Sequence, residues 1–246
     1  MNRQSAFSYL CNACGRCCHD KVITLSPYDV LRIARAAGIS TGEAMRRFTI
    51  RRGSLLRFDA TGACGALDGA RCRLHQGRPL ACRLYPLGIE RAENGREERF
   101  VSLEPAASSL GVYGDDLSGS VEDFLEAQDV EPYLAAIARY RRLIRILRDR
   151  ARELADFEKI EAREFWRKAV REALAESDYD PNPLIDAMFD SDGLVGLRED
   201  EEDTVRVHVA ALEARARRIT DANLLASAAV MLAISLGYSP HDVVEV

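Results

Sequence analysis

The chain has 246 residues, of which 47% are hydrophobic and 30% are charged, a balance typical of a globular protein with one or two domains. The formal net charge is -5 at pH 7, so overall charge excludes a protein that binds nucleic acid through its whole surface. No apolar run is long enough to span a bilayer, and the first ten residues lack the apolar core of a signal peptide. We therefore expect a cytoplasmic protein with no membrane partner.

Seven cysteines lie within the first 82 residues, and none follows. Four of them fall within eight residues, and the other three are more widely spaced. The cysteines are Cys11, Cys14, Cys17, Cys18, Cys64, Cys72 and Cys82. Because thiols stay reduced in the cytoplasm, clustered cysteines there bind metal more often than they form disulfides.

The segment after the first cysteines carries strong helix signals. A short strand is expected over residues 22–25, followed by a helix over 27–37. Ser26 is a suitable N-cap, and Pro27 suits the first helical position. Gly38 can adopt the left-handed conformation that ends a helix.

A second, shorter helix is predicted directly afterwards. Ser40 and Glu43 have the spacing of a capping box, and the helix that they open ends near Phe48. Residues 49–82 are loop-rich and offer little with which to build a core, so a bound metal would have to stabilise them. The glycines that separate the last three cysteines are Gly62, Gly65, Gly69 and Gly77.

A β-hairpin is predicted next, from strands over 88–91 and 99–103. Asn94 and Gly95 lie between them and form a common hairpin turn. Residues 105–120, rich in glycine and serine, are expected to be a linker.

From residue 120 the sequence is typical of long helices. Apolar residues at alternating spacings of four and three predict a long helix over 137–154. A second helix is predicted over 162–174, after which Pro181 and Pro183 interrupt the pattern. The residues of the first apolar seam are Ile137, Tyr140, Ile144, Leu147, Ala151 and Leu154.

The last part of the chain predicts two more helices. Gly193, Gly196 and the acidic run 199–203 are expected to form an exposed connection, followed by a helix over 205–219. Asp221 can cap a fourth helix that ends near Gly237. We therefore predict a mainly α fold with two domains, a metal-stabilised domain with a small hairpin over 1–115 and a helical bundle over 116–246.

The first cysteines have the spacing of an iron–sulfur site. In a C-x2-C-x2-C run, three thiolates converge on one inorganic cluster and the fourth ligand comes from elsewhere in the chain. Cys11, Cys14 and Cys17 fit this pattern, and Cys18 should point away from them. One of the remaining four cysteines could complete the cluster, and the other three could build a second, incomplete site.

A site with three thiolates needs another ligand. His75 lies three residues after Cys72, a usual chelate spacing, and His19 directly follows the first cysteines. Substrate or water is the other possibility, because catalytic metal sites keep an open position. Four thiolates also suit zinc, but the usual zinc pattern is two C-x2-C pairs, so a 4Fe–4S cluster is favoured and zinc is the alternative.

The spacing of the cysteines and their neighbours resembles that of a known family. From Phe7 to the first four cysteines, then through Cys64 and Cys72 to the Arg78-Pro79 and Tyr85-Pro86 pairs, the chain is similar to the CxxCxxCC (YkgJ-type) proteins. The likeness covers residues 7–111. It implies chelation of zinc or iron, and the related flagellin lysine-N-methylases are regarded as iron–sulfur proteins, so a methylase-like modifying activity is one implication.

Two positions depart from that family. Where it usually has a tyrosine, three residues after the sixth cysteine, this chain has His75, and where it usually has an eighth cysteine, this chain has Ala107. A second metal site would therefore have three thiolates or use His75. The resemblance implies nothing about residues 120–246.

Other candidates have simpler explanations. Arg78 and Arg83 lie among the cysteines and would either offset the negative charge of a cluster or serve helix ends and surface packing. The arginine-rich segment 139–152 could bind RNA or an acidic protein, although a solvated helix face is the simpler interpretation. His208 is expected to be a structural histidine.

Two classes of function follow from the sequence. The first is a cytoplasmic iron–sulfur protein that transfers electrons or modifies a protein or RNA substrate. The second is a zinc-stabilised binding module without catalysis. The sequence identifies no catalytic residue.

Overall fold

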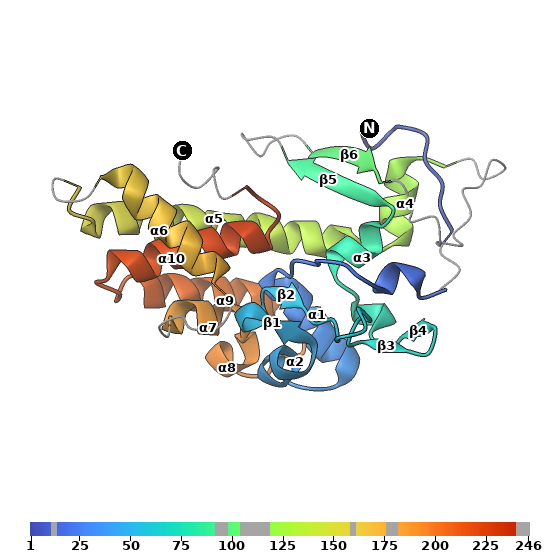
Figure 1. The fold of residues 1–246 in the computed structure, drawn as a ribbon, viewed down its shortest axis with the longest axis horizontal. Coiled ribbons are helices and arrows are strands. Elements are labelled where there is room, and N and C mark those ends of the chain that lie inside the picture. Colours follow the sequence, from blue (N-terminus) through green and yellow to red (C-terminus); the bar gives the residue numbers. More distant parts are fainter. Residues whose placement is uncertain (11–13, 92–97, 104–118, 158–160, 176–181, 240–246) are drawn as a thin grey trace.

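The computed structural model describes residues 1–10, 14–91, 98–103, 119–157, 161–175 and 182–239 (Figure 1). Helices dominate these residues, and the strands are short and confined to the N-terminal part, so the predicted mainly α fold is confirmed. None of the described helices is both long enough and apolar enough to cross a membrane.

The described residues of the N-terminal part form three short helices and three small antiparallel sheets. Its helices are α1 Pro27–Ala37, α2 Thr41–Phe48 and α3 Leu80–Leu84. Its 3-10 turns are η1 Arg16–Cys18, η2 Arg51–Gly53 and η3 His75–Gly77. Its strand pairs are β1 Thr49–Ile50 with β2 Leu55–Leu56, β3 Leu67–Asp68 with β4 Arg71–Cys72, and β5 Leu87–Arg91 with β6 Glu98–Ser102.

The predicted first helix is confirmed at both ends. Ser26 Oγ accepts a hydrogen bond from Asp29 N at 3.1 Å, and the Asp29 carboxylate accepts one from Ser26 N at 2.7 Å. Gly38 ends the helix with φ 66. The same Asp29 carboxylate also accepts from Leu80 N at 2.7 Å, so it joins the start of α1 to the start of α3.

The second predicted helix is also present, but only half of its capping box forms. Ser40 Oγ accepts from Glu43 N at 3.3 Å. The Glu43 side chain instead forms ion pairs with Arg46 and Arg47. The strand predicted over 22–25 is wrong, because Thr24 makes only a single bridge with Leu55.

The predicted hairpin is present as β5 and β6. Its register pairs Gly88 with Val101 and Ile89 with Phe100, which is fully buried. The predicted turn at Asn94 and Gly95 and the predicted linker lie largely outside the described residues.

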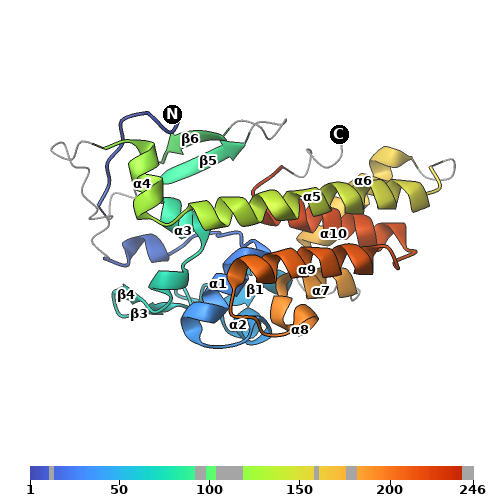
Figure 2. The same ribbon diagram turned by 180° about the vertical axis from the view of Figure 1, so that it is seen from behind.

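From residue 121 onward, the regular elements among the described residues are helices. These are α4 Val121–Ala127, α5 Glu131–Leu154, α6 Ala162–Leu174, α7 Pro183–Phe189, α8 Ser191–Val195, α9 Glu201–Ala216 and α10 Ala222–Ser235. The long α5 packs against α9 and α10, and α6 packs against α10 (Figures 1 and 2). The predicted seam is the reason, since Tyr140, Leu147 and Ala151 on α5 are almost fully buried.

The predicted exposed connection is present over residues 196–200, but it is wrong for Gly193, which lies in α8, and for residues 201–203, which begin α9. Asp200 caps α9, its carboxylate accepting from Asp203 N at 2.6 Å, and the acidic residues that follow form the first helical turn. Negative charge is favourable there because the first turn of a helix presents unpaired N–H groups. A run of acidic residues by itself does not distinguish an exposed connection from the first turn of a helix, so the start of α9 could not be placed from the charges alone.

The two parts of the chain contact each other directly. The predicted domain boundary falls in residues 104–118, which are outside the described residues. On either side of it, Phe7 N donates to Gly119 O at 3.0 Å, and the Phe7 and Phe124 rings meet edge to face at 5.0 Å. The helix α1 also packs against α5, where Tyr28 and Tyr133 form a second edge-to-face pair.

The arginine-rich segment lies on α5. Several of its arginines have acidic neighbours, for example Arg139 with Glu202 and Arg150 with Glu153. Arg152 lies over the ring of Trp166 at 5.9 Å. These contacts fit a solvated helix face, and binding of RNA or of an acidic protein through this segment stays a prediction.

His208 on α9 is fully buried where α9 meets α5 and α7. Its Nε2 donates to Ala187 O at 2.9 Å, and its Nδ1 accepts from the Tyr140 hydroxyl at 2.7 Å, an assignment that follows because a carbonyl can only accept. Burial lowers the pKa of His208 to about 4. The imidazole is therefore neutral in the folded protein at neutral pH.

We expect this histidine to make folding pH-dependent in a defined window. Between pH 6.5 and about 4 the unfolded chain binds a proton at His208 that the folded chain does not, so stability falls as pH falls. The loss should reach about 3 kcal/mol and level off below pH 4. Urea unfolding of the wild type and of His208→Gln from pH 7 to 4 measures it. The variant should be less stable at pH 7 but less sensitive to pH, and equal slopes for both proteins would contradict this origin.

Candidate metal centre

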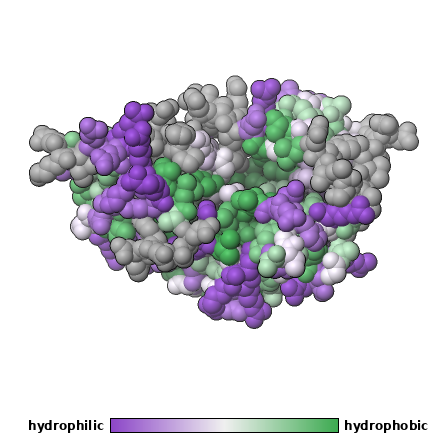
Figure 3. All heavy atoms as spheres, viewed as in Figure 1, coloured by the Kyte–Doolittle hydropathy of each residue, from purple (hydrophilic) through white to green (hydrophobic). Residues whose placement is uncertain are grey.

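A cavity of about 600 Å³ opens between the first cysteine segment, α3 and the β5–β6 hairpin. Figure 3 shows a hollow with apolar residues at the centre of this face of the molecule. All the described cysteines line the cavity, and so does His75. The lining thiols are Cys14, Cys17, Cys18, Cys64, Cys72 and Cys82. The predicted ligand Cys11 lies outside the described residues.

Backbone pairing brings the first cysteines and Cys64 together. Cys64 N donates to Cys18 O at 2.9 Å, and His19 bridges to Ala63. Asp20 N donates to Gly62 O at 2.9 Å and continues the same pairing. Two segments more than 40 positions apart therefore run side by side, which places Cys17, Cys18 and Cys64 around one space.

The β3–β4 hairpin supplies the next thiol. Cys72 lies in β4, opposite Leu67 in β3. The turn approaches the first cysteines so closely that a Cβ at Gly15 would lie 2.9 Å from Ala70 O. Gly15 also has φ 70, a conformation that side chains disfavour. Glycine is needed here for both reasons.

The last two candidate ligands lie on η3 and α3. His75 opens η3, which packs so tightly on α1 that a Cβ at Gly77 would lie 2.1 Å from Arg32 O. Cys82 lies in α3, whose first N–H is held by Asp29. Burial raises the pKa of Asp29, while its hydrogen bonds from Ser26 and Leu80 oppose that shift.

The thiols differ in how readily they ionise. The hydrogen bond from Cys18 lowers the pKa of Cys17 to about 6, and the same bond raises the pKa of Cys18. Burial raises the pKa of Cys64, Cys72 and Cys82. Cys17 therefore ionises more readily than Cys18, Cys64, Cys72 and Cys82, and the thiolate is the form that binds metal.

Positive charges lie close to the thiols. Lys21 lines the cavity and lowers the pKa of Cys17 through its charge, and Arg78 lowers that of Cys72 in the same way, although other factors are larger. Burial, with the charges of Arg78 and Arg83, lowers the pKa of His75. That shift favours the neutral imidazole, which is the form that coordinates metals.

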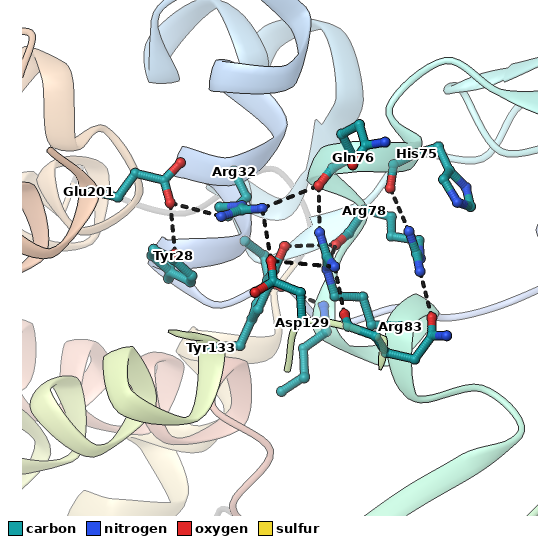
Figure 4. A network of polar contacts seen from close by, with 12 residues as sticks. Tyr28, Arg32, His75, Gln76, Arg78, Arg83, Asp129, Tyr133 and Glu201 are labelled. Carbon is teal, nitrogen blue, oxygen red and sulfur yellow. Dashed lines mark hydrogen bonds and ion pairs between the residues drawn. The ribbon is translucent and has the colours of Figure 1, made fainter. Parts of the chain in front are cut away.

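The position of Arg83 fits neither of the two roles that the sequence suggested for it. It is only 4% exposed, and its guanidinium donates to three backbone carbonyls rather than pointing into the cavity, as Figure 4 shows for part of this network. Arg78 donates to His75 O at 2.7 Å and to Gln128 Oε1 at 2.6 Å. Both arginines therefore organise the segment around the candidate ligands, and only Arg78 is a close charge neighbour of a candidate ligand thiol.

The sequence did not predict the rest of the cavity. Leu87 and Ile89 from β5, Leu103 after β6 and Leu236 after α10 form an apolar extension of it. These residues come from distant segments and carry no shared motif, so only the fold reveals that they meet. Among the described residues, no three His, Cys, Asp or Glu side chains are grouped closely enough to hold one metal ion.

The family comparison shows which class of protein carries this cysteine pattern. Residues 10–103 match the CxxCxxCC family model, described as a "putative zinc- or iron-chelating domain". The match includes all seven cysteines and His75 and ends before the helical part. Neither the curated proteins nor the solved structures gave a match. The match supports chelation of zinc or iron over residues 10–103, whereas the ligand set, the choice of metal and a methylase-like activity stay predictions.

The close approach at Gly15 can be tested with a matched glycine. Gly69 also has a positive φ, 59, but a Cβ there would meet nothing within 4 Å. Both Gly15→Ala and Gly69→Ala should cost about 1–2 kcal/mol in backbone strain. Only Gly15→Ala should also push the Ala70 turn away and lower the bound metal per chain. Metal analysis and thermal melts of both variants measure this, and equal metal content would show that the contact does not matter.

Proposed function

We propose that the chain binds an iron–sulfur cluster of the 4Fe–4S type in the thiol-lined cavity and uses it for electron transfer or for the modification of a macromolecular substrate. The observation that carries this proposal is that thiols from four separate segments line one cavity. Cys11, Cys14 and Cys17 would supply three ligands, and one of the other cysteines the fourth. The remaining thiolates, with His75, would hold a second metal.

The donor set fits this kind of group. Thiolates are soft ligands that select iron–sulfur clusters, zinc or Cu(I). The walls of the cavity are mostly apolar, and Cys64 is only 8% exposed, whereas the other described thiols are half-buried. Lys21 and Arg78 would offset part of the negative charge that a thiolate-ligated cluster carries.

The protein's own residues would set the properties of the cluster. Such a group supplies reversible one-electron transfer when it is bound. The apolar walls would control the local dielectric, and the basic side chains would favour the reduced form. The alternative is a zinc ion held by the same thiolates with a purely structural role.

Anaerobic purification separates the two possibilities. An iron–sulfur protein should be brown, absorb near about 400 nm from thiolate-to-iron charge transfer, and contain iron and acid-labile sulfide. Metal analysis with electron paramagnetic resonance of the reduced protein checks this. A colourless protein with zinc and no sulfide would replace the proposal with the structural alternative, and a metal-free native protein would contradict both.

We expect Cys14→Ala and Cys17→Ala to lose metal and destabilise the N-terminal part, because metal-binding energy in such a domain is folding energy. The thermal melt should shift downward together with the metal content. A variant with native metal content and native melting temperature would show that the replaced thiol is not a ligand.

His75→Ala should have a narrower effect. If this histidine completes a second site, its loss should change that site and leave the first cluster intact. His19→Ala tests the other histidine that the sequence offers as a ligand, whose Nδ1 lies 3.3 Å from Gly15 O and whose ring does not line the cavity. Unchanged metal stoichiometry and spectrum in His75→Ala would show that His75 is not a ligand.

A further inference from the structure

Arg83 carries a buried positive charge next to the candidate ligands. It directly follows Cys82, it does not line the cavity, and its side chain is only 4% exposed. A buried guanidinium is costly unless its donors are satisfied. Its acceptors therefore show what this residue is held against.

The acceptors come from two separate parts of the chain. Arg83 donates to Gln76 O and, at 3.3 Å, to Arg78 O, which both belong to the segment between His75 and Cys82. It also donates to Gln128 O at 2.6 Å, in the connection between α4 and α5. One side chain thus links the candidate ligand segment to the start of the helical part.

The α4–α5 connection is shaped to receive this side chain. Asp129 has φ 52, a left-handed conformation that aspartate tolerates better than most residues. Its carboxylate lies 3.7 Å from Arg83 and 3.4 Å from Arg32, so it forms ion pairs with both arginines. The turn therefore presents a carbonyl and a carboxylate to the same side.

A tyrosine of α5 completes the contact. Arg83 and Arg32 lie over the Tyr133 ring at 5.0 Å and 5.6 Å from its centre (Figure 4). The Tyr133 hydroxyl donates to Arg78 O at 2.9 Å. Arg78 also donates to the Gln128 side chain, so the segment is held at several points.

We propose that Arg83 is a positioning residue of the metal centre, which fixes the segment from His75 to Cys82 against the α4–α5 connection. This inference rests on the proposed metal binding. It assigns a role to the helical part that the family match does not cover, because Gln128, Asp129 and Tyr133 complete the frame around the candidate ligands. Arg83 acts through backbone carbonyls and does not itself bind the metal.

The test compares metal release from the intact chain with Arg83 replaced. The wild type and the variants are purified anaerobically, and the loss of bound metal to a chelator is followed well below the melting temperature. Arg83→Met should release metal at least about tenfold faster, since losing residues that support metal ligands has effects of this size. Its electron paramagnetic resonance or charge-transfer spectrum should also change. Arg71→Met removes an equal charge from an exposed position next to Cys72 and should match the wild type.

Arg83→Lys separates positioning from charge. Lysine keeps the positive charge but cannot present the fork of donors that reaches three carbonyls. We expect Arg83→Lys to release metal faster than the wild type. Wild-type release and spectrum in Arg83→Lys, with faster release in Arg83→Met, would overturn positioning in favour of a charge effect.

A milder pair of variants covers the case in which Arg83→Met does not fold. Tyr133→Phe removes one hydroxyl from the contact and keeps the ring, and it should speed release about threefold, as expected from the loss of one hydrogen bond. Tyr140→Phe removes a buried hydroxyl from the same helix at His208, and its release should match the wild type. Equal release from both would overturn the inference, whereas a wild type without metal would contradict the proposed function itself.

Discussion

The pairing of residues 18–20 with residues 62–64 is the contact on which the thiol-lined cavity depends. Two backbone hydrogen bonds, at Cys18 and Asp20, flank the bridge between His19 and Ala63 and join segments that would otherwise be separate loops. Few apolar side chains lie in these segments, so hydrogen bonds between main chains set their relative position. Once the segments are paired, Gly15 lets the β3–β4 turn approach, and Cys72 reaches the same space.

The sequence could predict the elements whose signals are local. Ser26 and Gly38 marked both ends of α1, and the apolar seam of α5 followed from its spacing. The whole of α7 and the start of α9 lie outside the predicted helices although Asn182 and Asp200 are N-caps, because prolines and acidic runs also mark breaks between helices. The apolar wall of the cavity could not be predicted, since Leu87, Leu103 and Leu236 meet only through the fold.

The cysteine pattern indicated chelation, but the structure adds the means by which the ligands would be placed. Two candidate segments are held by charged side chains that are not themselves ligands: Asp29 holds the start of α3, and Arg83 holds the residues between His75 and Cys82. Such contacts leave little trace in a motif, because a buried carboxylate or guanidinium at one position can be recognised only from its acceptors and donors.

The hydrogen bond from Arg83 to Gln128 O joins the cysteine-containing part of the chain to the helical part. A fragment that stopped before α4 would keep every cysteine and the whole span of the family match, yet its Arg83 would have lost the carbonyl and the ring that shield it. Water would then take their place around a guanidinium that the intact protein keeps dry. The structure of this fragment would therefore differ from that of the same residues within the whole chain.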